Sequence, residues 1–384
     1  MSLPEPESDR RAFLQGESLR RSLQHAADRL PSGGSEADPS VNTDELRRQD
    51  WIAASADTLR LSQVSMACDF EIALNRDGST HLGAISDALE LIARIEDQIT
   101  LYRSSSELIE LNRHAADWPI EVEPRLFELL LTAQRLAHET DGAFNPAAGP
   151  LVQLWRECRM AERIPQPQEI ADRLNRTGPE QIELDETART VRFRQSGVEC
   201  NLNAIGKGWA LDRAGELLRE RGATDWLMHA GQSSLLSCGS HAGLPGWPVR
   251  LRNPLMAHHG LGTLRLIDRA LSTSGNGVQF YRYQGQRYGH LLDPRTGWPV
   301  EKVLAVSVVA PTATEAEALS TAFFVLGVEK AQIYCHNHEE VGAIIVPPPQ
   351  GGRLLEPVVI GLSRDLLFFE PSECATVHWL DTKS

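Results

Sequence analysis

The chain has 384 residues and a formal net charge of -14, with 52 acidic side chains against 38 basic ones. Such an acidic chain lacks the electrostatic footprint of proteins that bind a phosphate backbone, so we expect no nucleic-acid partner. It contains no run of about eighteen apolar residues, so we expect no helix that spans a membrane.

The N-terminal region contains a pair of arginines, Arg10 and Arg11, in a setting that looks like a twin-arginine export motif. An export signal also needs an apolar segment, and charged residues such as Glu17 follow instead. The apolar residues here have helical spacing, which predicts a short amphipathic helix and a cytoplasmic protein, with export as the alternative. Composition then divides the chain into 1–56 (helix and flexible linker), 57–369 (folded domain) and 370–384 (C-terminal tail).

Hydrophobic periodicity predicts the elements of the folded domain. Strict alternation over 64–74 predicts one half-buried strand, and the small polar residues of 270–277 predict an interruption between strands. Strands and helices mix without strict alternation, so the predicted fold class is α+β. The other predicted elements are helices over 84–99, 124–137 and 315–326, strands near 181–184, 190–194, 249–251, 262–266, 303–310 and 341–346, and a hairpin over 281–288. The six cysteines are scattered, which predicts free thiols.

The stretch from Cys200 to Ser234 stands out. A turn at 203–208 precedes a helix that ends at Gly222, and a strand over 226–230 follows. A glycine-bearing turn at a helix start presents backbone N–H groups to an anion, here with Lys207 beside them. The spacing is not that of a Walker A loop, so the alternative is a helix start with a solvated lysine.

Two further pairs of residues could carry chemistry. Glu317 and Thr321 are four residues apart on one predicted helix and offer the hard oxygen ligands that Mg²⁺ takes. The alternative is an exposed glutamate and a threonine bonded to its own helix. His290 and Asp293 flank a tight turn, where they serve either acid–base chemistry or structure.

In their order along the chain, these segments resemble the ApbE-type flavin transferases, which are FAD:protein FMN transferases. The resemblance runs from about Val64 to Gly327. The motifs that carry it are the strand at Met66 and the segments 102–112, 141–155, 205–212, 273–276, 290–297 and 318–322.

The resemblance implies an enzyme that binds FAD, needs Mg²⁺, and moves FMN onto a threonine or serine of a target flavoprotein with release of AMP. It implies that His290 accepts the proton of the attacking hydroxyl and that Asp293 supports it. The metal ligands it implies are the backbone carbonyl of Ala204 and the side chains of Glu317 and Thr321. The residues it implies for the FAD site are Met66, Tyr102, Ala143, Phe144, Asn145, Asn201, Lys207 and Leu291.

The chain departs from the family pattern at several positions, and three of these changes remove or move a carboxylate. Asn145 and Asn201 stand where the family usually has aspartate, and Glu317 is one methylene longer than the usual aspartate. Two alternatives therefore stay open. One is an FAD pyrophosphatase that gives FMN and AMP, with water replacing the protein hydroxyl. The other is a flavin-binding protein without catalysis.

Overall fold

The computed structural model describes residues 58–256, 258–276 and 280–381, without the side chains of residues 76 and 77. The predicted N-terminal helix and linker lie outside these residues. The cytoplasmic location and the alternative of export therefore both stay predictions. In the described part, no helix is long and apolar enough to cross a membrane, and all six cysteines are free thiols.

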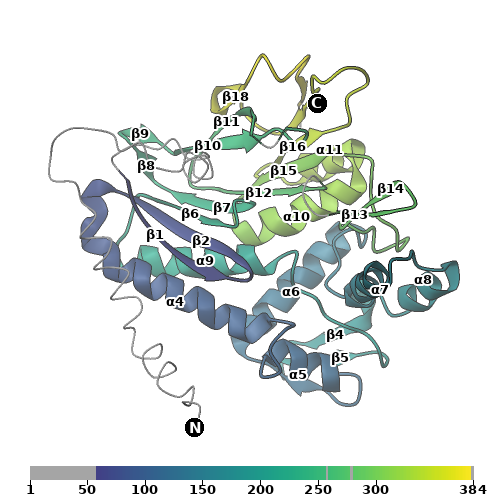
Figure 1. Cartoon of the computed structure of the whole chain (residues 1–384). Helices are drawn as coiled ribbons and strands as arrows, with labels where there is room; N and C mark the ends of the chain where they lie inside the picture. Colours follow the sequence, from purple (N-terminus) through teal and green to yellow (C-terminus); the bar gives the residue numbers. More distant parts are fainter. Residues whose placement is uncertain (1–57, 257, 277–279, 382–384) are drawn as a thin grey trace, which may run out of the picture. The chain divides into compact units, whose positions relative to one another are not determined.

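A nine-stranded sheet organises the described part (Figure 1). Neighbouring strands are antiparallel, except for the last pair, which is parallel. In sheet order the strands are β1 (Thr58–Ser65), β2 (Cys68–Asn75), β6 (Trp226–Ala230), β7 (Ser234–Cys238), β12 (Ala270–Gly275), β15 (Ala305–Ala310), β16 (Gly342–Val346), β17 (Val358–Ile360) and β19 (His378–Leu380). The mixture of this sheet with helices confirms the predicted α+β class.

Three helices, α4 (Leu82–Ile99), α9 (Gly206–Glu220) and α10 (Ala313–Leu326), pack against one face of the sheet (Figure 1). The sheet is buried on both faces, because alternate residues of one strand belong to different cores. In β6, for example, Met228 packs with the helices whereas Leu227 packs on the opposite side. Such strands read as continuous apolar runs.

A three-stranded sheet covers the second face of the large sheet with its own apolar cluster. Its strands are β10 (Trp247–Arg252), β11 (Gly260–Leu266) and β18 (Leu367–Phe369).

The remaining elements surround the ends of these layers. The helices are α5 (Glu107–His114), α6 (Pro124–Glu139), α7 (Gly149–Met160), α8 (Pro167–Leu174) and α11 (Val328–Asn337), with short 3₁₀ turns at Arg76–His81, Pro179–Gln181 and Arg364–Leu366. The strands are β3 (Ile120–Glu121), β4 (Ile182–Asp185) and β5 (Thr190–Phe193) in one sheet, and the pairs β8 (Ser240–His241) with β9 (Leu244–Pro245) and β13 (Phe280–Tyr283) with β14 (Gln286–Gly289).

The single strand predicted over 64–74 is wrong, because the chain reverses inside it. Met66 and Ala67 both have positive φ values, of 50° and 58°, which form a two-residue turn between β1 and β2. Ser65 pairs with Cys68 across this turn, so Val64 lies on the opposite face from Phe70. In β1 the odd-numbered residues lie on the face of Phe70, whereas in β2 the even-numbered residues do. The apolar alternation in the sequence therefore does not mark one continuous face.

The interruption predicted at 270–277 is also wrong over 270–275, which form the central strand β12. Its small polar side chains are tolerated because they bond to hydroxyl groups on its neighbours. The Thr273 hydroxyl lies 2.8 Å from that of Ser307 on β15, and the Ser274 hydroxyl lies 2.9 Å from that of Ser320 on α10.

The C-terminal segment predicted as a peripheral tail contributes structure that the prediction did not include. β19 pairs in parallel with β17 at the edge of the large sheet. Before it, the buried side chain of Glu373 accepts a hydrogen bond of 2.7 Å from Asn253.

Candidate active site

The predicted anion-binding turn lies at the start of α9, although the residues just before it, 198–202, form no regular strand. The backbone N–H of Asn201 donates to the Pro146 carbonyl at 2.7 Å, and the Asn201 side chain accepts from the Asn203 N–H at 3.0 Å. Asn145 in turn accepts from the Ala147 N–H at 2.8 Å. These bonds join the loop that carries Asn145 to the turn that carries Lys207.

Lys207 and Glu317 form an ion pair between α9 and α10. The same carboxylate accepts a hydrogen bond from the Gly208 N–H at 2.6 Å and lies 3.4 Å from the Ser234 hydroxyl. Glu317 is only 4% exposed, which excludes the solvated glutamate considered from the sequence. Burial alone would lower the pKa of Lys207, but the charge and hydrogen bond of Glu317 outweigh it and raise that pKa.

A chain of hydroxyl groups links Glu317 to Thr321, and sequence reasoning missed it. Ser234 lies 3.3 Å from Ser272, which lies 3.4 Å from Ser320. Ser274 then lies 2.9 Å from Ser320 and 3.4 Å from the Thr321 hydroxyl. The strands β7 and β12 supply the serines that face α10, so a polar cluster is buried here with its hydrogen bonds made.

The first turns of α9 and α10 satisfy each other's free N–H groups. Glu317 of α10 accepts from Gly208, while Asp212 of α9 accepts from the N–H groups of Ala313 and Thr314, both at 2.8 Å. The first N–H groups of a helix have no partner within the helix, so this exchange fixes the two helix ends against one another. It therefore also fixes the distance between Lys207 and Glu317.

Asp212 gives a pH-dependent prediction for stability. Burial raises the pKa of this carboxyl from 3.8 to about 6, although the hydrogen bonds from Thr314 and Ala313 oppose the rise. A carboxyl whose pKa rises on folding favours the folded state when protonated. We therefore expect the stability advantage of the wild type over Asp212→Asn to shrink as pH rises from about 4 to about 6. Urea unfolding of both proteins across this range measures it, and an advantage that grows with pH would contradict the raised pKa.

Asp293 of the predicted acid–base pair has contacts that fix its place in the loop. Both carboxylate oxygens of Asp293 accept from Arg295, at 2.8 Å each. The Asp293 carbonyl also accepts from the Gly297 N–H at 2.8 Å, so Asp293 holds the turn that follows His290. His290 is exposed at the start of this loop. Asp293 thus shapes the loop that begins at the exposed His290.

The other predicted FAD-lining residues differ in how far their side chains are exposed. Tyr102 is 75% exposed, and Arg156 lies 5.9 Å from its ring centre. Ala143 and Phe144 are 1% and 2% exposed, so their side chains belong to the core and offer a ligand little beyond backbone. Met66 and Leu291 are half-buried at the core margin.

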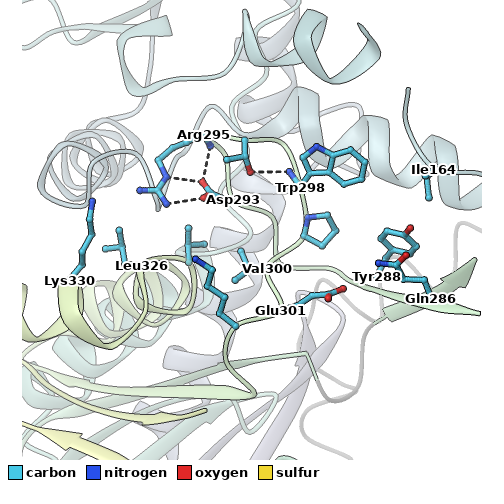
Figure 2. A pocket seen from close by; sticks show the side chains of 14 residues that line it. Ile164, Gln286, Tyr288, Asp293, Arg295, Trp298, Val300, Glu301, Leu326 and Lys330 are labelled. Carbon is cyan, nitrogen blue, oxygen red and sulfur yellow. Dashed lines mark hydrogen bonds and ion pairs between the residues drawn. The ribbon is translucent and has the colours of Figure 1, made fainter. Parts of the chain in front are cut away.

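A cavity of about 820 Å³ lies beside the His290 loop (Figure 2). It is lined by residues between Asp293 and Lys302, by the end of α10 and by Lys330 on α11. None of the eight residues predicted to line FAD, all of them described, lines this cavity, whereas Asp293 does.

Sequence comparison with known proteins identifies the family of this chain. The model of the ApbE family matches residues 66–345. The chain belongs to the ApbE family. It is 33% identical over 263 residues to an FAD:protein FMN transferase of Klebsiella pneumoniae, covering 68% of this chain and 81% of that one. It is also 30% identical over 322 residues to an FAD:protein FMN transferase of Treponema pallidum, and this match covers 77% of this chain and 86% of that one.

Solved ApbE structures share the fold. The ApbE protein of Thermotoga maritima superposes with a TM-score of 0.69 at 27% identity, covering 76% of this chain and 94% of that one. The flavin transferase ApbE of Vibrio cholerae superposes with a TM-score of 0.67 at 25% identity, covering 80% of this chain and 98% of that one. The predicted resemblance is therefore confirmed.

Proposed function

We propose that this ApbE-family chain is an enzyme that transfers FMN from FAD to a threonine or serine hydroxyl of a target flavoprotein and releases AMP. The observation that carries the proposal is the buried Lys207–Glu317 cluster at the start of α9, in a chain whose relatives are named FAD:protein FMN transferases. A cationic side chain at a helix start is suited to a pyrophosphate.

The reaction needs positioning and charge stabilisation rather than a covalent enzyme intermediate. The acceptor oxygen forms a bond to the FMN phosphorus of FAD, and the bond from that phosphorus to the AMP oxygen breaks. The proton of the acceptor hydroxyl passes to His290, which is exposed and able to meet it. Lys207 stabilises the negative charge on the phosphate oxygens.

The FAD site is proposed around the turn before α9 and the loop that is bonded to it. Asn201 and Asn145 lie in these two segments, which are joined through the Pro146 carbonyl. Tyr102, the most exposed aromatic residue of the predicted set, offers a ring face for flavin or adenine. Met66, Ala143, Phe144 and Leu291 complete the proposed lining.

Mg²⁺ fits the oxygen groups at this site. No cluster of three His, Cys, Asp or Glu side chains suited to a metal occurs among the residues that the structure describes. Mg²⁺ often uses only one or two carboxylates together with substrate phosphates, and Glu317 with Thr321 matches that pattern. The Ala204 carbonyl accepts no hydrogen bond from the described residues, so it is available as a third oxygen. Bound there, the ion would neutralise pyrophosphate charge.

Thr321→Val tests this function, because it replaces a hydroxyl by a methyl group of similar size. With FAD, Mg²⁺ and a flavin-free acceptor flavoprotein, we expect the wild type to release AMP and to attach FMN to the acceptor. We expect the variant to lose about 10²-fold or more in transfer rate, the scale of losing one charge-stabilising contact. Thr177→Val makes the same exchange at a buried threonine remote from the site and is the control.

Three outcomes separate the candidate functions. AMP with FMN on the acceptor supports the transferase. AMP and free FMN, with no labelled acceptor, would replace it by the pyrophosphatase. FAD binding without AMP at any Mg²⁺ concentration would leave a flavin-binding protein.

A further inference from the structure

The cavity beside the His290 loop adjoins the proposed chemistry, and none of the predicted FAD-lining residues lines it. Val325, in its wall, lies one turn after Thr321 on α10, and Asp293 belongs both to the wall and to the proposed catalytic loop. A volume of about 820 Å³ suits a short segment of chain rather than a folded domain.

The two ends of the cavity differ in chemistry. Figure 2 shows Arg295 and Lys330 at one end, and Tyr288, Gln286 and Ile164 at the other. Arg295 is engaged by Asp293, but Lys330 meets only the exposed Asp141 at 3.3 Å. Exposed pairs of this kind contribute little, so Lys330 is available to a ligand.

Lysine itself is concentrated here. The 38 basic residues include only four lysines, namely Lys207, Lys302, Lys330 and Lys383. Of the three that the structure describes, one pairs with Glu317 and the other two line this cavity. Lys302 is exposed and forms no ion pair with a described residue. Two mobile ammonium groups are therefore placed at the cavity in a chain that uses arginine almost everywhere else.

Part of the cavity wall is a fixed aromatic surface. Trp298 is 38% exposed and packs edge-on against Trp155, with ring centres 5.6 Å apart. The Trp155 indole donates to the Gly297 carbonyl at 2.7 Å, which anchors the turn that carries Trp298. A rigid aromatic residue that is partly exposed in a concave site is typical of a binding anchor.

We propose that this cavity is the docking groove for the acceptor protein. It binds the extended segment that carries the acceptor hydroxyl, with an acidic side chain against Lys302 and Lys330 and an apolar side chain against Trp298. The groove then delivers the hydroxyl toward Thr321 and His290. This inference rests on the proposed transferase function.

The test is Lys302→Gln/Lys330→Gln, which removes both charges and leaves a polar side chain one atom shorter at each position. The acceptor is a flavin-free flavoprotein domain that normally carries FMN on a threonine through its phosphate. We expect KM for the acceptor to rise about tenfold, with the affinity for FAD unchanged within about twofold. Arg192→Gln, on β5 away from the cavity, removes an exposed positive charge as the control.

Charge exchange sharpens the test. Lys302→Glu/Lys330→Glu should lose more acceptor affinity than the neutral pair, and lysine in place of the acidic residues beside the acceptor threonine should restore part of it. A structural effect of the substitutions would not be rescued in this way. In parallel, the acceptor should slow acetylation of Lys302 and Lys330 by acetic anhydride, whereas FAD alone should not.

The outcomes distinguish a failure of the docking-groove proposal from a failure of the transferase function. If the wild type labels the acceptor and the double variants keep the wild-type KM, or lose FAD affinity instead, the groove is overturned while the transferase stands. If the wild type labels no acceptor, the transferase falls and the groove falls with it.

Discussion

Replacing Glu317 by glutamine should abolish FMN transfer and destabilise the fold. The amide keeps the size of the side chain but leaves the Lys207 ammonium without its counter-charge, and it removes the carboxylate proposed for Mg²⁺. Breaking a buried ion pair by removing one partner costs about 3–5 kcal/mol. Because Lys207 is 23% exposed, we expect the lower end of that range. Urea unfolding and AMP release measure the two effects separately.

The controls separate charge from shape. In Lys207→Met/Glu317→Gln neither charge remains, so we expect most of the lost stability to return while the activity stays absent. Glu317→Asp keeps the charge on a shorter stem and carries the residue usual in the family, so it should retain measurable transfer. If Glu317→Gln were as stable and as active as the wild type, the ion pair between α9 and α10 would have neither of the functions assigned to it.

Much of the fold could be predicted from the sequence, because long amphipathic helices leave a clear periodic signal. The helix predicted at 84–99 is α4, and the helix at 315–326 lies within α10. The signal failed where tertiary context decided the structure. Alternation at 64–74 could not reveal the turn at Met66 and Ala67, neither of which is a usual residue for positive φ.

Sequence reasoning singles out individual residues of the candidate site but does not predict how they are arranged. Lys207 and Glu317 were singled out for different purposes, and only the packing of α9 on α10 makes them one ion pair. The serines at 234, 272 and 320 gave no signal, since isolated serines in a sequence indicate neither burial nor a shared network. The bond from Arg295 to the Asp293 carboxylate gave no signal in the sequence either.

Gly208→Ala should be among the most damaging single substitutions in the domain. A Cβ at this position would lie 2.2 Å from the Ala313 carbonyl oxygen and 2.7 Å from the Thr314 nitrogen. These are backbone atoms, so no side-chain rotation relieves the clash, and α9 must move away from α10. That movement would separate the Gly208 N–H from Glu317 and Asp212 from the start of α10. We expect a loss of about 3 kcal/mol or more, the scale of severe overpacking, together with loss of transfer.

Gly83→Ala is the matched control, because it also lies in a helix, α4, and a Cβ added there would meet no atom within 4 Å. Alanine favours the helix over glycine by about 1 kcal/mol, so this variant should be as stable as the wild type or slightly more stable. The contrast in unfolding midpoint between the two variants isolates the close approach of the helices from the general effect of replacing glycine. Equal stability of Gly208→Ala and the wild type would mean that α9 and α10 are not held at this distance, and the shared carboxylate site between them would lose its physical basis.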